Sequence, residues 1–162
     1  MNLKLVEADY LNPQHQQVIP FLLNAYAMDP MGGGEALDKD VYDQLVPSLA
    51  KLPHALSILA YLDDQPVGLA NCFEAFSTFA CKPLINIHDL CVLKEYRGLG
   101  ISLKLLRKVE ELALARGCCK ITLEVLSDNL VAKSAYQKFG FAGYALDPST
   151  GSAVFWQKKL SD

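Results

Sequence analysis

Residues 84–116 read LINIHDLCVLKEYRGLGISLKLLRKVEELALAR, and this stretch decides how the chain is organised. Its first ten residues are mostly apolar, a pattern typical of a buried strand. A turn with glycines at 98 and 100 follows, and an amphipathic helix begins directly after it. The first N–H groups of a helix have no intrahelical partner. A strand, a glycine turn and a helix start therefore favour binding of an anion, most often a phosphate.

The composition is that of an ordinary globular protein. The chain has 162 residues, of which 51% are hydrophobic and 20% charged, so we expect a single domain over residues 1–162. A net charge of −3 gives no general attraction to nucleic acid or to an anionic membrane, and we expect neither as a partner. No apolar run approaches the roughly 20 residues that span a bilayer, and the first residues do not have the pattern of a signal peptide.

The cysteines and histidines argue against a disulfide framework and a metal site. The five cysteines are odd in number, have no C-x-x-C spacing and lie mostly in apolar runs. We interpret them as reduced cysteines and expect a cytoplasmic location. With only three histidines in the chain, we expect no metal cluster.

Hydrophobic periodicity predicts alternating strands and helices along the whole chain. Strands are expected at residues 3–7, 55–62, 67–76, 84–93, 119–126, 141–146 and 153–158, and helices at about 13–28, 38–52, 100–116 and 129–139. Asp38 is expected to cap the second helix and Gly140 to end the last one. The resulting order, β-α-α-β-β-β-α-β-α-β-β, predicts a mixed α/β sheet.

A second block, LEVLSDNLVAKSAYQKFGF at residues 123–141, changes the reading of the glycine turn. Alone, RGLGIS at 97–102 is neither a dinucleotide fingerprint nor a P-loop, and its glycines could serve backbone geometry only. Together the two blocks resemble the GNAT superfamily of acetyl-CoA-dependent N-acetyltransferases. The turn matches Arg/Gln-x-x-Gly-x-Gly/Ala except at Ser102, and Asn129, Ala132, Tyr136 and a Phe-Gly-Phe ending match the second block.

The resemblance is strongest to the polyamine and small-amine acetyltransferases. It implies a single-domain α/β (α+β) fold with a mixed, mostly antiparallel sheet flanked by helices. It also implies direct transfer of an acetyl group from acetyl-CoA to a primary amine of a small molecule. The family often pairs through its C-terminal strands, so a homodimer is one expectation.

The resemblance further implies which residues hold the cofactor. Backbone groups of the turn would bind the pyrophosphate of coenzyme A, and backbone of the preceding strand would pair with the pantetheine arm. The expected cofactor-binding residues are Leu90, Cys91, Val92, Arg97, Gly98, Leu99, Gly100, Ile101, Ser102, Leu103, Asn129, Ala132 and Tyr136.

Tyr136 and His88 are the expected catalytic residues. By the resemblance, Tyr136 is a general acid that protonates the departing coenzyme A thiolate; a tyrosine at a helix–sheet seam is the alternative. His88 and Asp89 interrupt an apolar strand. Most of an amine acceptor is protonated at pH 7, so a histidine there suits a general base, directly or through water. Asp89, water, or a purely structural histidine are the alternatives. Because neighbouring strand residues point to opposite faces, His88 and Asp89 are not expected to share a role.

The acceptor is expected between the first two helices and the strand near residue 124. Candidate substrate-binding residues are Tyr26, Asp29, Glu35, Phe76, Asp89 and Glu124, next to a loop with glycines at 32–34. In the polyamine enzymes an acidic residue lies where His88 falls, so the preference for cationic substrates stays open. A route through an acetyl-cysteine is the lesser mechanism. A non-catalytic acyl-CoA-binding module and a protein or peptide acetyltransferase are the alternative functions.

Overall fold

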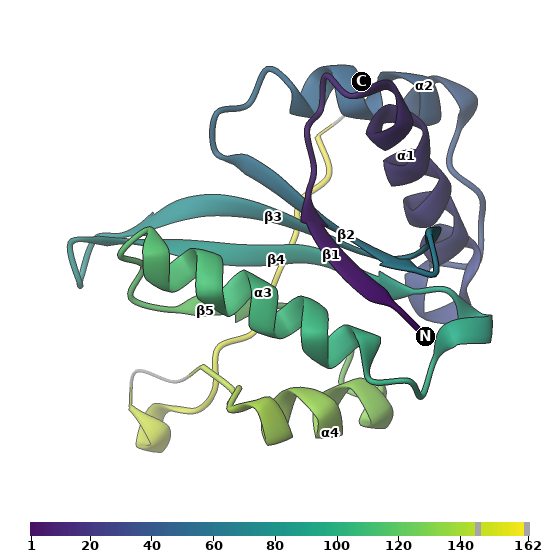
Figure 1. The fold of residues 1–162 in the computed structure, drawn as a ribbon. Helices are drawn as coiled ribbons and strands as arrows, with labels where there is room; N and C mark the ends of the chain where they lie inside the picture. The colour runs from purple at the N-terminus through teal and green to yellow at the C-terminus, as the bar shows by residue number, and fades with distance from the viewer. Residues whose placement is uncertain (145–146, 161–162) are drawn as a thin grey trace. The chain divides into compact units, whose positions relative to one another are not determined.

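A five-stranded sheet forms the framework of the first 126 residues. The computed structural model describes residues 1–144 and 147–160, in two compact units divided after Leu126. The strands are β1 (Leu3–Glu7), β2 (Ala55–Leu62), β3 (Gln65–Ser77), β4 (Lys82–Val92) and β5 (Ile121–Leu123). They lie in the order β1-β2-β3-β4-β5, with the first three pairings antiparallel and β4–β5 parallel (Figure 1). The predicted mixed, mostly antiparallel sheet is confirmed.

Helices cover both faces of this sheet. They are α1 (Pro13–Met28), α2 (Lys39–Leu49) and α3 (Ile101–Ala115). α1 and α2 form a buried cluster with Leu69 of β3 on one face. α3 lies on the other face. The evidence is its Leu105 side chain, which approaches Gly68 of β3 so closely that a Cβ at Gly68 would lie 3.2 Å from it. Gly68 and Leu69 are neighbours in one strand and therefore point to opposite faces. Figure 1 shows α1 and α2 on one side of the sheet and α3 on the other.

The helix starts and ends follow local chemistry. The Asn12 side chain accepts hydrogen bonds from the backbone N–H groups of the first turn of α1, and Pro20 is buried inside that helix without ending it. Asp38 occupies the N-cap position of α2, as predicted, but its side chain makes no capping hydrogen bond. Helical spacing predicts that Val41, Leu45, Leu49 and Leu52 share an apolar face of this helix. Val41 is exposed instead, and Val46 and Leu49 are the residues of α2 that are buried.

The hairpin between β2 and β3 turns through two aspartates. Asp63 and Asp64 have φ values of +48° and +66°, so both adopt the left-handed conformation that a tight two-residue hairpin requires. Asp63 also accepts a hydrogen bond from the backbone N–H of Asn2, at 2.7 Å. This contact ties the N-terminus to the hairpin end.

The second unit contains one well-formed helix. α4 (Leu130–Phe139) is capped by the Asn129 side chain, which accepts from the Ala132 N–H at 3.2 Å. Gly140 ends it with φ = +117°, and its N–H bonds the Tyr136 carbonyl. A short 3-10 helix, η3 (Pro148–Thr150), follows. The predicted C-cap at Gly140 is confirmed.

The two strands predicted at residues 141–146 and 153–158 are not formed in the part of them that the structure describes. Residues 145–146 lie outside the described residues. One backbone hydrogen bond, from Ala153 N–H to the Tyr144 carbonyl at 2.9 Å, marks where the hairpin was expected. Phe155 and Trp156 are exposed, so apolar burial does not stabilise this segment, and an isolated two-stranded hairpin is marginal in water. β5 is also shorter than predicted, at three residues.

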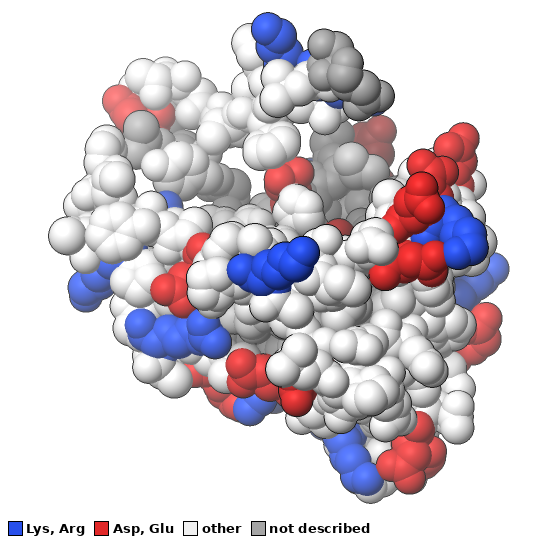
Figure 2. Space-filling model, turned by 90° about the horizontal axis from the view of Figure 1, so that it is seen from above, with Lys and Arg blue, Asp and Glu red and all other residues white. Residues whose placement is uncertain are grey.

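Charged side chains occur in small groups on the surface. In the view of Figure 2, acidic and basic residues are interspersed, with uncharged surface between them. Among the described residues, no helix is long and apolar enough to cross a membrane.

Candidate active site

The glycine turn after β4 presents a row of backbone N–H groups. Between β4 and the turn lies a 3-10 helix, η2 (Lys94–Tyr96). Gly98 and Gly100 have φ values of +81° and +75°, a left-handed conformation that disfavours residues with a Cβ. Gly100 is the N-cap of α3 and makes no side-chain capping bond. The glycines therefore have a conformational reason to be there.

These N–H groups have no acceptor among the residues that the structure describes. None of the backbone N–H groups from Gly98 to Leu103 donates a hydrogen bond to any described residue. They lie at the N-terminal end of α3, where the helix dipole favours negative charge. An anion with several acceptor oxygens, such as a pyrophosphate, suits this donor set.

β4 and β5 pair over a short distance and then lose contact. The parallel ladder runs from Ile85↔Ile121 to Ile87↔Leu123 and no further. Beyond it, residues 90–92 pair with β3 alone. The Val92 carbonyl accepts a hydrogen bond from Arg97 Nε at 3.0 Å. On the side away from β3, the C-terminal part of β4 therefore has no strand neighbour within residues 1–144 and 147–160, as pairing with an extended ligand would require.

A β-bulge in β4 brings His88 and Asp89 to the same face. The β3–β4 ladder pairs Asn71 with Asp89 and Cys72 with Ile87, which leaves His88 as an extra residue. The His88 ring lies edge-on to Phe73 with centroids 5.6 Å apart, while Asp89 accepts from Asn71. Asn71 and Phe73 are two residues apart in β3 and share a face. The expectation that His88 and Asp89 point to opposite faces was wrong, because the bulge interrupts the alternation.

Asp89 lies at the end of a row of polar side chains that crosses three strands. Tyr10 and Ser57 are joined through their hydroxyls at 2.9 Å, and the Ser57 hydroxyl donates to Asn71 Oδ1 at 2.6 Å. Asn71 Nδ2 then donates to Asp89 Oδ2 at 3.1 Å. We did not predict Tyr10, Ser57 or Asn71 from the sequence. A polar residue inside an apolar strand is the signal that points to Asn71, but its partners Ser57 and Asp89 lie on the neighbouring strands, 14 and 18 residues away.

An ion pair links the glycine turn to the end of α1. Arg97 NH2 lies 2.7 Å from Asp29 Oδ2, and Asp29 also caps η1 (Pro30–Gly32) by accepting from Met31 N–H. The hydrogen bond from Arg97 is the largest cause that holds the pKa of Asp29 below its ordinary value. Two residues that were predicted for the site, Arg97 and Asp29, therefore form an ion pair with each other.

The other predicted acceptor residues are spread along this unit. Tyr26 is partly buried, and burial first, then the negative charge of Asp89, raises its pKa. Glu35 and Glu124 are exposed. Phe76 pairs with Pro83, five residues along β3 from Asn71, which places it about 16 Å from the bulge at 3.3 Å per residue. Tyr26 and Asp89 are brought together, and Phe76 is not.

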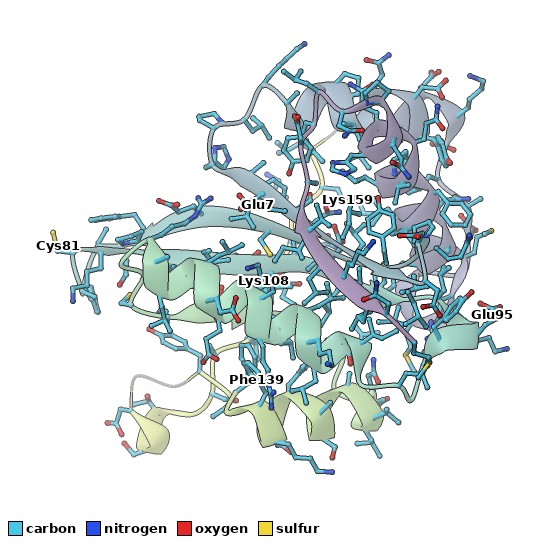
Figure 3. All side chains as sticks on the ribbon, in the orientation of Figure 1. Glu7, Cys81, Glu95, Lys108, Phe139 and Lys159 are labelled. Atoms are coloured by element: carbon cyan, nitrogen blue, oxygen red, sulfur yellow. The ribbon has the colours of Figure 1, made fainter. Side chains whose placement is uncertain are left out.

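Figure 3 gives the orientation of β4. Cys81 marks the tip of the β3–β4 hairpin, and Glu95 marks η2 beside the glycine turn, at the opposite end of the strand. Phe76 belongs to the hairpin end, whereas residues 90–92 run toward the turn. The acceptor candidates that the structure groups with the turn are therefore those of α1 and of the bulge.

The predicted residues of the second unit have local partners. The side-chain oxygen of Asn129 accepts a hydrogen bond from the Ala132 backbone N–H and so caps the helix. Tyr136 is partly buried, and its ring lies edge-on to Phe141 with centroids 5.9 Å apart. Asn129 thus has a structural task in starting α4, which does not compete with a cofactor contact by neighbouring backbone.

The cysteines do not offer an activated thiol at the bulge. Cys72 and Cys91 flank this region of the sheet, and burial raises the pKa of each to about 12. A thiol with such a pKa stays protonated near neutral pH and is a poor nucleophile. Among the residues that the structure describes, no three His, Cys, Asp or Glu side chains are grouped so that they could hold a metal ion.

Comparison with known proteins places this geometry in a family. The sequence profile of the acetyltransferase (GNAT) family matches residues 20–141, which is more than half of the chain. A thialysine N-epsilon-acetyltransferase of Bos taurus is 38% identical over 74 residues, covering 46% of this chain and 43% of the relative. The chain therefore matches less than half of that relative's length. An aminoglycoside N(6')-acetyltransferase type 1 of Acinetobacter baumannii is 28% identical over 126 residues, covering 75% of this chain and 82% of the relative.

Solved structures share the fold over nearly the whole chain. An aminoglycoside N-acetyltransferase in complex with CoA superposes with a TM-score of 0.74 at 16% identity, covering 98% of this chain and 96% of the other. At this level of identity the likeness concerns the fold.

Proposed function

The chain belongs to the acetyltransferase (GNAT) family, and we propose that it moves the acetyl group of acetyl-CoA directly to a primary amine of a small molecule. The observation that carries the proposal is the row of backbone N–H groups from Gly98 to Leu103, none with an acceptor among the described residues, next to the unpaired part of β4. Acetyl-CoA is the acetyl donor of the family. The relatives named for thialysine and aminoglycosides act on amines of small molecules, which supports that substrate class.

The turn would hold the cofactor through backbone alone. Its N–H groups donate to the pyrophosphate oxygens, and the positive end of α3 adds a favourable interaction with their charge. Because Ser102 contributes an N–H like any other residue, its departure from the family pattern leaves the donor set intact. Residues 90–92 offer backbone groups to the pantetheine arm, which would take the place of a strand neighbour on that side of β4.

The bulge would receive the acceptor amine. His88 is exposed and lies on the same face as Asp89, so a base and a carboxylate are presented together. The amine must lose a proton before its lone pair can attack the acetyl carbonyl carbon, and the His88 imidazole accepts that proton, directly or through a water. Asp89 offers its negative charge to the ammonium form that arrives. With Cys72 and Cys91 held as thiols, direct transfer is the route that remains at this face.

Tyr136 would complete the reaction by protonating the coenzyme A thiolate. This role follows from the family's second block rather than from any distance. With reference pKa values near ~10 for tyrosine and ~8.5 for a thiol, full proton transfer is uphill by about 2 kcal/mol. Because complete transfer before cleavage would add this cost, the proton is expected to move in concert with C–S cleavage. A positioned acid typically accelerates such a step by about 10²- to 10⁴-fold.

The test is Tyr136→Phe, with Tyr144→Phe as a matched substitution in the same unit. We expect Tyr136→Phe to lower kcat by about 100-fold or more, since the acid is lost while the ring and its contact with Phe141 remain. Thiol release is measured with a panel of polyamines, amino acids and aminoglycosides, and acetyl-CoA affinity by calorimetry. Affinity should stay within about twofold, and Tyr144→Phe should resemble the unmodified protein.

Two results would contradict the proposal. An unchanged kcat in Tyr136→Phe would remove the acid assignment. Tight binding of acetyl-CoA without thiol release for any amine in the panel would instead favour a non-catalytic acyl-CoA-binding module.

A further inference from the structure

Two polar side chains lie in the core of the sheet. Ser57 is 1% exposed and Asn71 is 3% exposed, and they are the polar side chains that are fully buried among the described residues. Both lie on the face that α1 and α2 cover, where β2 and β3 otherwise contribute apolar side chains. Burying an amide and a hydroxyl there costs free energy unless every polar atom is satisfied. The partners of both side chains therefore have to be accounted for.

The hydrogen bonds around these residues have a single direction. The one hydroxyl proton of Ser57 goes to Asn71 Oδ1, so the Tyr10 hydroxyl donates to Ser57 Oγ. With its oxygen engaged, Asn71 turns its NH2 group outward, toward Asp89 Oδ2. The row therefore ends on a carboxylate oxygen as its final acceptor. Reversing the amide would place its oxygen against that carboxylate.

Asp89 stands where the row leaves the core. Among the described residues, Asn71 is the side chain that donates a hydrogen bond to Asp89, and this bond engages the Oδ2 atom of the carboxylate. Its charge acts on Tyr26 of α1, whose pKa it helps to raise, after burial. The bulge places His88 beside it on the same face. A carboxylate accepts several hydrogen bonds, so the second oxygen of Asp89 has capacity for a donor from outside the protein.

We propose that Asn71 is a positioning residue, which, with Ser57 and Tyr10 behind it, fixes the Asp89 carboxylate so that its second oxygen receives the ammonium group of a cationic acceptor. This inference rests on the proposed function and identifies the residues that would give the site its preference for a positively charged acceptor. An unanchored Asp89 would rotate about its side-chain torsions, and the acceptor would lose a fixed partner next to His88. Asn71 acts through Asp89 and need not touch the acceptor.

A double-mutant cycle tests this coupling. The variants are Asn71→Leu, which keeps the branching at Cγ but removes both polar atoms, Asp89→Asn, and the double substitution. The acceptors are 1,4-diaminobutane, thialysine and neamine, all cationic at neutral pH, and the fastest of them in thiol release is used throughout. We expect Asn71→Leu to raise KM for that amine at least tenfold, with kcat within about threefold. In the Asp89→Asn background the same substitution should change KM less than twofold, because contributions that act through one group are not additive.

Controls separate positioning from folding. The unfolding midpoint and the acetyl-CoA affinity of each variant are measured alongside the kinetics. Ser57→Ala removes the group that orients the Asn71 amide and leaves the bond to Asp89, so it should raise KM in the same sense but less. If Asn71→Leu does not fold, the cycle is measured with Ser57→Ala in its place.

The outcomes distinguish this inference from the proposed function. An Asn71 effect of equal size with and without the Asp89 carboxylate overturns the positioning role, as does a loss confined to kcat. Absence of thiol release with all three amines counts against the proposed function. In that case the same cycle is measured as calorimetric affinity for 1,4-diaminobutane in the presence of CoA, and an Asp89-dependent Asn71 effect on affinity still supports the inference.

Discussion

The glycine turn and the bulge follow each other in one stretch of sequence, yet they are built from different groups. The turn offers backbone N–H groups from consecutive residues, so this donor set does not depend on which side chains the residues carry. The bulge offers the side chains of His88 and Asp89, held by Phe73 and Asn71 of a neighbouring strand. The difference teaches that the proposed cofactor site can be built locally, while the proposed acceptor site next to it depends on distant residues.

The proposed role of the bulge is tested most directly by a substitution at His88. We expect His88→Gln to lower kcat by about 100-fold, because a positioned base is lost while a polar side chain of similar size remains. His54→Gln is the matched control, since the His54 ring also lies against Phe73, with centroids 6.0 Å apart, but outside the bulge. Steady-state thiol release compares them. If both variants retain full kcat, the base is not His88.

The turn side is tested by deleting one backbone donor. Ser102→Pro removes an N–H in the first turn of α3, where that N–H has no intrahelical partner. Loss of one hydrogen bond to a charged pyrophosphate, on the order of 1.5–3 kcal/mol, should weaken acetyl-CoA binding by at least tenfold in calorimetry. Ser102→Ala, which retains the N–H, should bind within about twofold. Equal losses in the two variants would mean that the side chain matters rather than the backbone.

The smallest effect is expected at the ion pair that connects the two regions through α1. Asp29→Asn removes the carboxylate that Arg97 contacts at 2.7 Å, and a partly exposed pair contributes less than about 1 kcal/mol to the free energy of unfolding. Because the pKa of Asp29 is lowered in the folded protein, this contribution is present above its ordinary pKa and is lost as pH falls through the lowered value.

Denaturant unfolding at two pH values checks this prediction. The unmodified protein and Asp29→Asn should differ in stability at pH 7 and converge near pH 2. A difference that persists unchanged in acid would show that another contact of Asp29, such as its cap on Met31 N–H, sets the stability.

Much of the fold was predictable because its elements carry local signals. Periodicity located β1 and α1 at the observed bounds, and the glycine turn and Gly140 stand where a positive φ is needed. Helical spacing predicts that Leu105, Leu106, Val109, Leu112 and Ala113 of α3 point inward, and all of these except Leu112 are buried. These features depend on residues a few positions apart, so a single sequence contains them.

The errors arise where a local pattern depends on a distant neighbour. Residues 153–158 have the composition of a strand, but a strand needs a partner, and the described part of that segment has a single backbone bond to Tyr144. Alternation predicted opposite faces for His88 and Asp89, but the register between β3 and β4 inserts a bulge there. The Arg97–Asp29 contact joins residues 68 positions apart and has no sequence signal.

The sequence by itself determined the family and the glycine turn, because a strand, two glycines and a helix start present consecutive backbone N–H groups in a form that suits an anion. The tertiary structure alone decided how the neighbouring strand is used. Only the register of β3 against β4 puts His88 and Asp89 on one face, and only the buried row from Tyr10 through Ser57 and Asn71 gives Asp89 its partner. Side chains that interact across strands are brought together by strand register and packing, and these contacts cannot be read from the order of residues along the chain.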